Sequence, residues 1–172
     1  MEINSIALLI SLIPALFLTL LSLFYFKQHL RNEAMRRKFE LQREKQKEAL
    51  PLRLQAYERI SLLMERIAPG KLMLRIAPIS EDKQQYASLL IQTIEQEFDH
   101  NLAQQIYMSE DCWNIVRSSK NEIVQLIRKS LVNENIINAQ QLREEILNQM
   151  VADGNPTEDA LRAIKSEVSE IF

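Results

Sequence analysis

The sequence predicts an all-α protein in which one transmembrane helix continues into a charged stalk, followed by a cytoplasmic bundle of about four to five helices. Beyond Pro51, apolar residues recur at helical spacing, and no segment shows the alternation or turn signals of a strand. The residues before Pro51 form two different segments: an uncharged apolar run near the N-terminus, and a basic segment that follows it. We therefore divide the chain into an anchor (residues 1–26), a basic helical stalk (27–50) and a bundle domain (51–172).

The anchor is predicted from the run Ile3 to Phe26, which carries no charged side chain. A helix of this length covers roughly 36 Å, and the hydrocarbon core of a bilayer is roughly 30 Å thick. A cleaved signal peptide would need a basic start, a shorter apolar run and small residues at the cleavage site. Met1-Glu2 and Phe24-Tyr25-Phe26 do not fit that pattern. We expect a retained single-pass anchor.

The orientation is predicted from the basic residues beside the anchor. Eight Lys and Arg residues lie between positions 27 and 48, and none lies before the span. Because basic flanks stay in the cytoplasm, we expect an inner-membrane protein with its N-terminus outside and its C-terminal domain cytoplasmic. The lone Cys112 agrees with a reducing compartment. We expect a basic collar facing anionic lipid, formed by Lys27, Arg31, Arg36, Arg37 and Lys38.

The stalk should be helical, since Lys27 to Ala49 contains no Gly, no Pro and no β-branched residue. Its apolar residues are too sparse for a sustained heptad seam, which favours a solvated charged helix over a coiled coil. Pro51 should interrupt the helix. The sparse apolar residues are Leu30, Met35, Phe39 and Leu41.

The first half of the bundle begins with an amphipathic helix from Leu52 to Ile67, ended by Ala68-Pro69-Gly70. The apolar segment Lys71 to Ile79 is expected to form one helical turn or an extended connector. Ser80 is the predicted N-cap of a long helix that reaches about Tyr107. The apolar stripe of that helix is predicted to contain Tyr86, Leu90, Ile94, Phe98, Leu102 and Ile106.

The second half contains three further helices. Ser109 is the predicted N-cap of the first, and the Asn-rich segment Asn133 to Asn138 separates it from the second. The second is shorter and ends near Gly154. Asn155-Pro156-Thr157-Glu158 has the features of a helix start, with proline at the first helical position, and begins the last helix.

Catalytic and cofactor motifs are missing from the sequence. There is no glycine-rich phosphate loop, no GxSxG and no HExxH, so we expect no catalysis and no cofactor. Residues 49–172 hold 13 basic and 18 acidic residues, a net charge of −5 that argues against nucleic-acid binding.

One polar patch stands out, and the residues leave two interpretations open: a binding surface for a partner or a small ligand, or a structural feature that is either a plain surface face or a buried network that sets helix register. Glu97 and His100 have the Glu-x-x-His spacing of a di-iron helix, but two histidines in the whole chain exclude a single-chain di-iron site. Metal or small-ligand binding at the patch stays a minor alternative. The patch contains Glu97, His100, Asn101, Gln104 and Gln105.

Two stretches carry a family resemblance. They are residues 52–69, LRLQAYERISLLMERIAP, and residues 97–107, EFDHNLAQQIY, with Trp113 beyond. Preceded by one membrane span, they resemble an uncharacterised bacterial family of small, single-pass, membrane-anchored helical proteins. The resemblance implies no activity and no site residue. It implies that these stretches form the centre of the folded domain.

The expected role is therefore interaction or scaffolding at the inner face of the membrane, without catalysis. The expected partners are the membrane itself and either another protein or a second copy of the chain. The alternative is a stalk-like subunit of a larger membrane complex.

Overall fold

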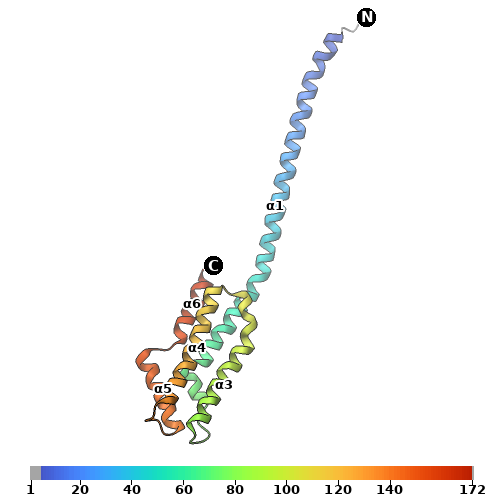
Figure 1. The fold of residues 1–172 in the computed structure, drawn as a ribbon. Helices are drawn as coiled ribbons and strands as arrows, with labels where there is room; N and C mark the ends of the chain where they lie inside the picture. The colour runs from blue at the N-terminus through green and yellow to red at the C-terminus, as the bar shows by residue number, and fades with distance from the viewer. Residues whose placement is uncertain (1–4, 172) are drawn as a thin grey trace. The chain divides into compact units, whose positions relative to one another are not determined.

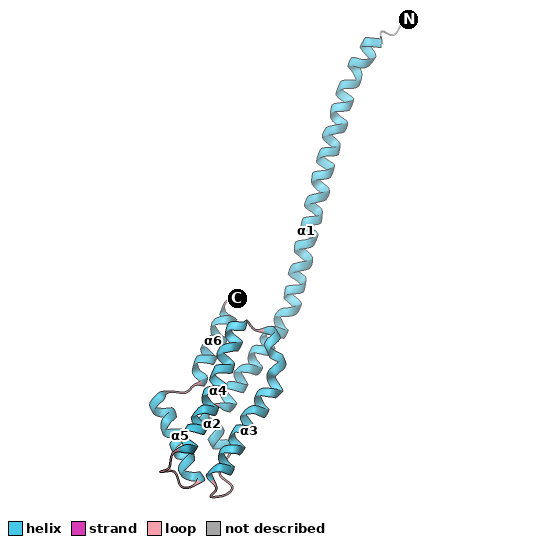
Figure 2. Ribbon diagram, viewed as in Figure 1, coloured by secondary structure: helices cyan, strands magenta, loops and turns pink. Residues whose placement is uncertain are grey.

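The computed structural model describes residues 5–171, and every regular element in that range is helical (Figure 2). The all-α fold class is thereby confirmed. Two compact units divide the chain, Met1–Ala49 and Leu50–Phe172, and each is described by itself. The elements are α1 (Ser5–Ile67), α2 (Pro69–Arg75), α3 (Lys83–Asn101), the 3-10 helix η1 (Leu102–Tyr107), α4 (Glu110–Val132), α5 (Ala139–Asp153) and α6 (Thr157–Ser169).

α1 is a single helix of 63 residues that contains both Pro14 and Pro51. The expected interruption at Pro51 is therefore wrong. A proline inside a helix removes the hydrogen bond to the carbonyl four residues earlier, here that of Lys47. Lys47 is exposed, so water can satisfy its carbonyl group and the helix continues.

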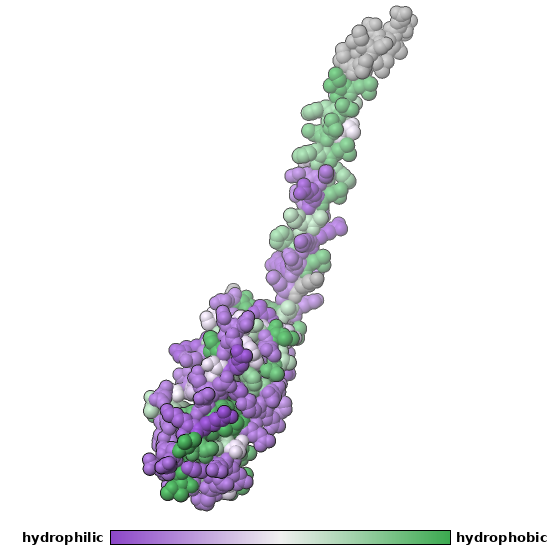
Figure 3. Space-filling view, viewed as in Figure 1, coloured by the Kyte–Doolittle hydropathy of each residue, from purple (hydrophilic) through white to green (hydrophobic). Residues whose placement is uncertain are grey.

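α1 is also the one helix within residues 5–171 that is long and apolar enough to cross a membrane, judged by length and composition. Its side chains from Leu12 to Phe26 are exposed, and Figure 3 shows this apolar surface giving way to hydrophilic residues along the helix. The first residues of the predicted span, Ile3 and Asn4, lie outside the described residues.

In the second unit, the helix predicted from Leu52 to Ile67 has a buried face, since Ile60, Met64 and Ile67 are fully buried. The apolar spacing also assigns Leu52 to this face, but Leu52 is 52% exposed, so that part of the prediction is wrong. The segment that was expected to be one helical turn or an extended connector instead contains a separate short helix, α2. α2 begins at Pro69, whose fixed backbone angle suits a first helical position, and its Leu72 and Met73 are buried.

The N-cap of α3 is Asp82 rather than Ser80. The Asp82 carboxylate accepts hydrogen bonds from the backbone N–H groups of Gln84, at 2.8 Å, and Gln85, at 3.3 Å. A carboxylate caps a helix N-terminus well because it also interacts with the helix dipole. Ser80 lies two residues before the cap, where its hydroxyl oxygen accepts a weak bond from the N–H of Asp82.

α3 ends earlier than expected, at Asn101, and the chain continues as η1. Tyr86, Leu90, Ile94 and Phe98 are buried as predicted, but Leu102 is 43% exposed and Ile106 is 74% exposed. A 3-10 helix has three residues per turn instead of 3.6. The stripe extrapolated at α-helical spacing is therefore wrong beyond Phe98.

α4 is the central helix of the second unit, because it packs against α3, α5 and α6 (Figure 1). Ser109 is its N-cap, as predicted, and the serine hydroxyl accepts a hydrogen bond from the N–H of Cys112 at 3.1 Å. α5 ends at Asp153, and its C-cap is Gly154, which has a φ of 92°. α6 begins at Thr157, so Pro156 is its N-cap residue and not its first helical residue as predicted. Asn155 Oδ1 accepts hydrogen bonds from the backbone N–H and hydroxyl of Thr157.

Candidate functional site

The predicted polar patch lies at the end of α3 and in η1, and Glu97 is its best-connected residue. Glu97 Oε1 accepts hydrogen bonds from Arg66 Nη2 at 2.6 Å and Nε at 3.0 Å. Arg75 Nη1 lies 3.4 Å from the same oxygen. These two cations come from α1 and α2, so Glu97 joins three helices and its carboxylate is already occupied by ion pairs.

The other members of the patch are arranged differently. Asn101 Nδ2 donates to the backbone oxygen of Glu97 at 2.8 Å, while His100 and Gln105 are exposed. Because the α-helix ends at Asn101, Gln104 and Gln105 follow 3-10 geometry and lose the α-helical alignment with His100. No group of three or more His, Cys, Asp and Glu residues able to hold a metal ion is found among residues 5–171.

A second polar cluster, which the sequence did not predict, surrounds the carboxylate of Glu167 near the end of α6. Glu167 Oε1 accepts hydrogen bonds from the hydroxyl of Tyr57 and the backbone N–H of Ser109, both at 2.7 Å. Glu167 Oε2 accepts from the hydroxyl of Ser109 at 2.9 Å. We call Arg53, Tyr57, Ser109, Cys112 and Glu167 the Glu167 network. It connects α1, the N-terminus of α4 and α6.

Arg53 completes this network from α1. Its Nη2 donates to the Tyr57 hydroxyl at 3.0 Å, its Nε donates to the backbone oxygen of Tyr107 at 3.4 Å, and its Nη2 lies 4.0 Å from Glu167 Oε1. The guanidinium also lies 5.9 Å from the centroid of the Tyr57 ring. The cation therefore balances the carboxylate and ties η1 to α1.

The pKa values in the network follow from burial and these bonds. Burial acts to raise the pKa of Glu167, but hydrogen bonds from Tyr57, Ser109 and Cys112 outweigh it and hold the pKa below its ordinary value. Burial, followed by the bond to Glu167, raises the pKa of Cys112 to about 12. Burial and the same carboxylate also raise the pKa of Tyr57.

These values determine what the network can do chemically. Glu167 stays ionised and both of its oxygens already accept hydrogen bonds, so it is a poor general base. The thiol of Cys112 stays protonated at neutral pH, whereas a nucleophilic cysteine needs to be a thiolate. The network is therefore suited to holding three helices together.

One signal of this network is visible in the sequence. Ser109, followed by Glu110 and Asp111, marks a helix N-terminus, and such an end attracts an anion through its free N–H groups and its dipole. Which of the 23 acidic residues supplies that anion is decided by the packing of α6 against α4.

A second charged contact lies against the aromatic part of the core. Lys120 Nζ donates to both carboxylate oxygens of Glu95, at 2.9 and 3.0 Å, and lies 5.0 Å from the centroid of the Phe98 ring. The Phe98 ring stacks on Trp113, with centroids 5.3 Å apart. Lys120 is only 9% exposed, so this pair and the ring satisfy a nearly buried charge between α3 and α4.

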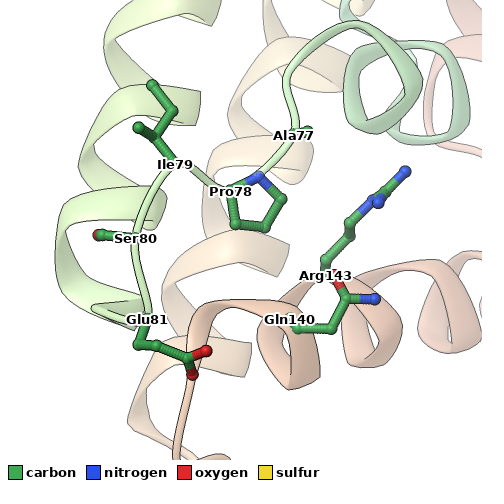
Figure 4. A pocket seen from close by; sticks show the side chains of 7 residues that line it. All are labelled: Ala77, Pro78, Ile79, Ser80, Glu81, Gln140 and Arg143. Atoms are coloured by element: carbon green, nitrogen blue, oxygen red, sulfur yellow. The ribbon is translucent and has the colours of Figure 1, made fainter.

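A pocket of about 410 Å³ lies between the α2–α3 loop and the first turns of α5 (Figure 4). Pro78 and Glu81 line it from the loop, and Gln140 and Arg143 line it from α5. The Nε atom of Arg143 is buried and has no hydrogen-bond partner. Exposed Ile79 gives the rim an apolar side chain. The pocket offers a guanidinium and a carboxylate from opposite walls, but no described bond orients either toward its interior.

Comparison with protein families gives a match over nearly the whole chain. The model of a family of unknown function, DUF7935, matches residues 3–171. No curated protein and no solved structure matches the chain.

Proposed function

The chain therefore belongs to DUF7935, a family of unknown function, and we propose that it is a membrane-anchored helical interaction or scaffolding protein. In this proposal α1 crosses the inner membrane once and the bundle lies at its cytoplasmic face. Catalysis is not part of the role.

The observation that carries the proposal is the continuous exposure of large apolar side chains along α1. Leu12, Phe17 and Phe24 are 59, 64 and 70% exposed, and the residues between them are similar. Apolar surface in water costs roughly 25 cal/mol per Å², so a lipid environment stabilises this segment. Its length suits the hydrocarbon core, and it contains no charged residue that would oppose insertion.

The orientation is supported by the basic collar directly after this segment. The side chains of Lys27, Arg31, Arg36, Arg37 and Lys38 are all exposed on α1. Two of them form i,i+4 ion pairs, Arg36 with Glu40 at 3.3 Å and Arg37 with Glu33 at 3.9 Å. Exposed pairs of this kind contribute little, so the collar remains available to anionic headgroups on the cytoplasmic side.

An interaction role for the bundle is supported by how its polar groups are used. Glu97 and Glu167 are both held by cations and hydroxyl or N–H donors from neighbouring helices. These two carboxylates therefore stabilise the fold, and contacts with a partner would be made by other side chains on the surface of the bundle. The large apolar side chains exposed on that surface by at least 74% are Leu74, Ile79, Ile106, Val132, Ile137 and Val151.

A second candidate role is that of a stalk subunit in a larger membrane complex. The observation that favours it is the length of α1, which continues through Pro51 for 63 residues. The two roles are distinguished by the stoichiometric co-purification of other membrane subunits, which only the second role requires.

The test is fractionation of the full-length chain carrying a reporter after Phe172. We expect the chain to stay in membranes after alkaline extraction and the reporter to behave as cytoplasmic. Introducing Leu16→Arg and Leu20→Arg together should release the chain from the membrane, because each arginine at mid-span makes insertion less favourable by about 2.5–3.5 kcal/mol. Met35→Arg, in the stalk, is the matched control and should leave it anchored. A wild-type chain released by alkaline extraction would refute the anchor, and a periplasmic reporter would refute the orientation.

A further inference from the structure

The stalk part of α1 carries opposite charges on two sides of one apolar stripe. At about 100° per residue, Leu30, Ala34 and Leu41 fall within about 40° of one another. Leu30 and Leu41 are 54 and 58% exposed. We call these three residues the stalk stripe. Exposed apolar side chains on a helix are stabilised when another helix covers them.

The cations Arg31 and Lys38 flank the stripe on one side, about 70° from its centre. Both are exposed. No acidic residue lies three or four positions away from either, since their neighbours at that spacing are Lys27, Gln28, Ala34, Met35, Leu41 and Gln42. Neither cation can therefore form an i,i+3 or i,i+4 ion pair within its own helix.

The acids Glu33 and Glu40 flank the stripe on the other side, about 90° from its centre. Each forms an ion pair within the helix, Glu33 with Arg37 at 3.9 Å and Glu40 with Arg36 at 3.3 Å. The two arginine side chains are 77 and 71% exposed, and exposed pairs contribute little, so the two acids remain available to a second helix. The stripe thus has one basic flank and one acidic flank. In heptad terms, Ala34 and Leu41 are at a, Leu30 is at d, the cations are at e and the acids are at g.

We propose that the stalk pairs with the stalk of a second copy of this chain, in parallel and in register. In such a two-fold pair, the acidic flank of each helix faces the basic flank of the other. The g position and the next e position are five residues apart, which places Glu33 opposite Lys38 of the second copy, twice by symmetry. This inference rests on the proposed function, because insertion in one membrane aligns the two helices and raises their local concentration.

A second copy of the chain fits better than another partner, because the stalk carries both the basic flank and the acidic flank that such a pair requires. The other exposed apolar pair on the stalk, Met35 and Phe39, lies about 140° from the stripe. It has cations on both sides, Lys38 on one and Arg36 and Arg43 on the other. A two-fold pair formed there would bring like charges together, so the stripe is the face that self-association uses.

The structure also limits how strong the pairing is. Beyond Leu41 the stripe positions are taken by Glu44 and Glu48, and Arg37 occupies one d position. The apolar seam therefore covers about three turns, and a soluble stalk peptide should stay monomeric. The association should weaken as salt rises, because exposed charge pairs are screened.

The experiment measures co-capture of two differently tagged full-length copies from membranes dissolved in mild detergent. Lys38→Glu places like charges opposite each other at Glu33, and Glu33→Lys does so at Lys38. Each variant should capture itself about tenfold less than the wild type does, from two pairs changed from attraction to repulsion. A mixture of the two variants should recover wild-type capture, as should a chain that carries both changes.

Arg43→Glu is the matched control, since it makes the same charge change about 160° from the stripe and should leave capture unchanged. Equal self-capture by wild type and Lys38→Glu would overturn the proposal, as would a mixture that stays as weak as each variant alone. Every variant is first located in the membrane fraction. A chain that is anchored but does not pair refutes this inference alone, whereas a chain that is not anchored refutes the proposed function.

Discussion

Replacing Glu167 by glutamine tests whether the Glu167 network holds α6 to the rest of the bundle. Glutamine keeps one oxygen for the donors Tyr57 and Ser109 N–H, and its amide can donate to the Ser109 hydroxyl. The shape is retained and the charge is lost. A hydrogen bond to a charged group contributes about 1.5–3 kcal/mol, against about 0.5–1.5 for a neutral one. All three bonds change, and each loses about 1 kcal/mol, so Glu167→Gln should lower the free energy of unfolding by about 3 kcal/mol.

The pH dependence of that loss is a sharper test than its size. The pKa of Glu167 is lowered in the folded state from an ordinary value of 4.5. A lowered pKa means that the carboxylate stabilises the fold fully above its unfolded pKa. This contribution is lost as pH falls from about that value through the lower folded pKa. The difference between wild type and Glu167→Gln should therefore be constant near neutral pH and shrink in acid.

The measurement is urea unfolding of a fragment beginning at Leu50, followed by circular dichroism at pH 7 and at several values below 5. The fragment corresponds to the second compact unit, and its wild-type melt should be cooperative. Glu170→Gln, on an exposed residue three positions later, is the matched control and should cost less than 0.5 kcal/mol. A loss below 0.5 kcal/mol for Glu167→Gln, or one that does not shrink in acid, would refute the role assigned to this carboxylate.

Three further predictions use the same fragment. Phe98→Ala and Trp113→Ala should each cost about 3–5 kcal/mol in urea melts, because each removes one ring of a buried stack, while exposed His100→Ala should cost under 0.5; the reverse order would contradict the core assignment. Arg143→Met should change the free energy of unfolding by no more than about 1 kcal/mol, because the Nε atom of Arg143 is buried without a hydrogen-bond partner. A larger loss would show that the guanidinium makes stabilising contacts. Cys112 should react with a thiol reagent at pH 8 far more slowly in the folded fragment than in urea, because its pKa is raised to about 12; equal rates would contradict its burial.

Local chemistry is what the sequence determined by itself. The helical apolar spacing was enough to find the buried residues Tyr86, Leu90 and Ile94, because one face of the helix must be covered. Ser109 was found as an N-cap because a hydroxyl before a helix satisfies its own N–H groups. Ser80 is the N-cap that the sequence predicts for α3, but the structure places the cap at Asp82, because local preference alone does not fix which of two nearby capping residues begins the helix.

The ends and continuations of helices depended on more than local preference. The α-to-3-10 change at Asn101 exposes Leu102 and Ile106 against their sequence pattern. Tyr107 in η1 is held by Arg53, a residue 54 positions earlier. Pro51 lies within a helix because water can satisfy the carbonyl group of exposed Lys47, which loses its backbone donor. The spacing of apolar residues in a sequence contains no information about such contacts or hydration.

The charged sites were decided only by the tertiary structure. Glu97 was expected in a polar patch, and the structure brings Arg66 and Arg75 from two other helices to it. Glu167 did not stand out among the acidic residues of the sequence. The packing of α6 against α4 sets its carboxylate at the N-terminus of α4, 110 positions from its donor Tyr57. Side-chain type and spacing determine which face of a helix is buried, whereas the choice among chemically equal carboxylates depends on which helix ends meet in three dimensions.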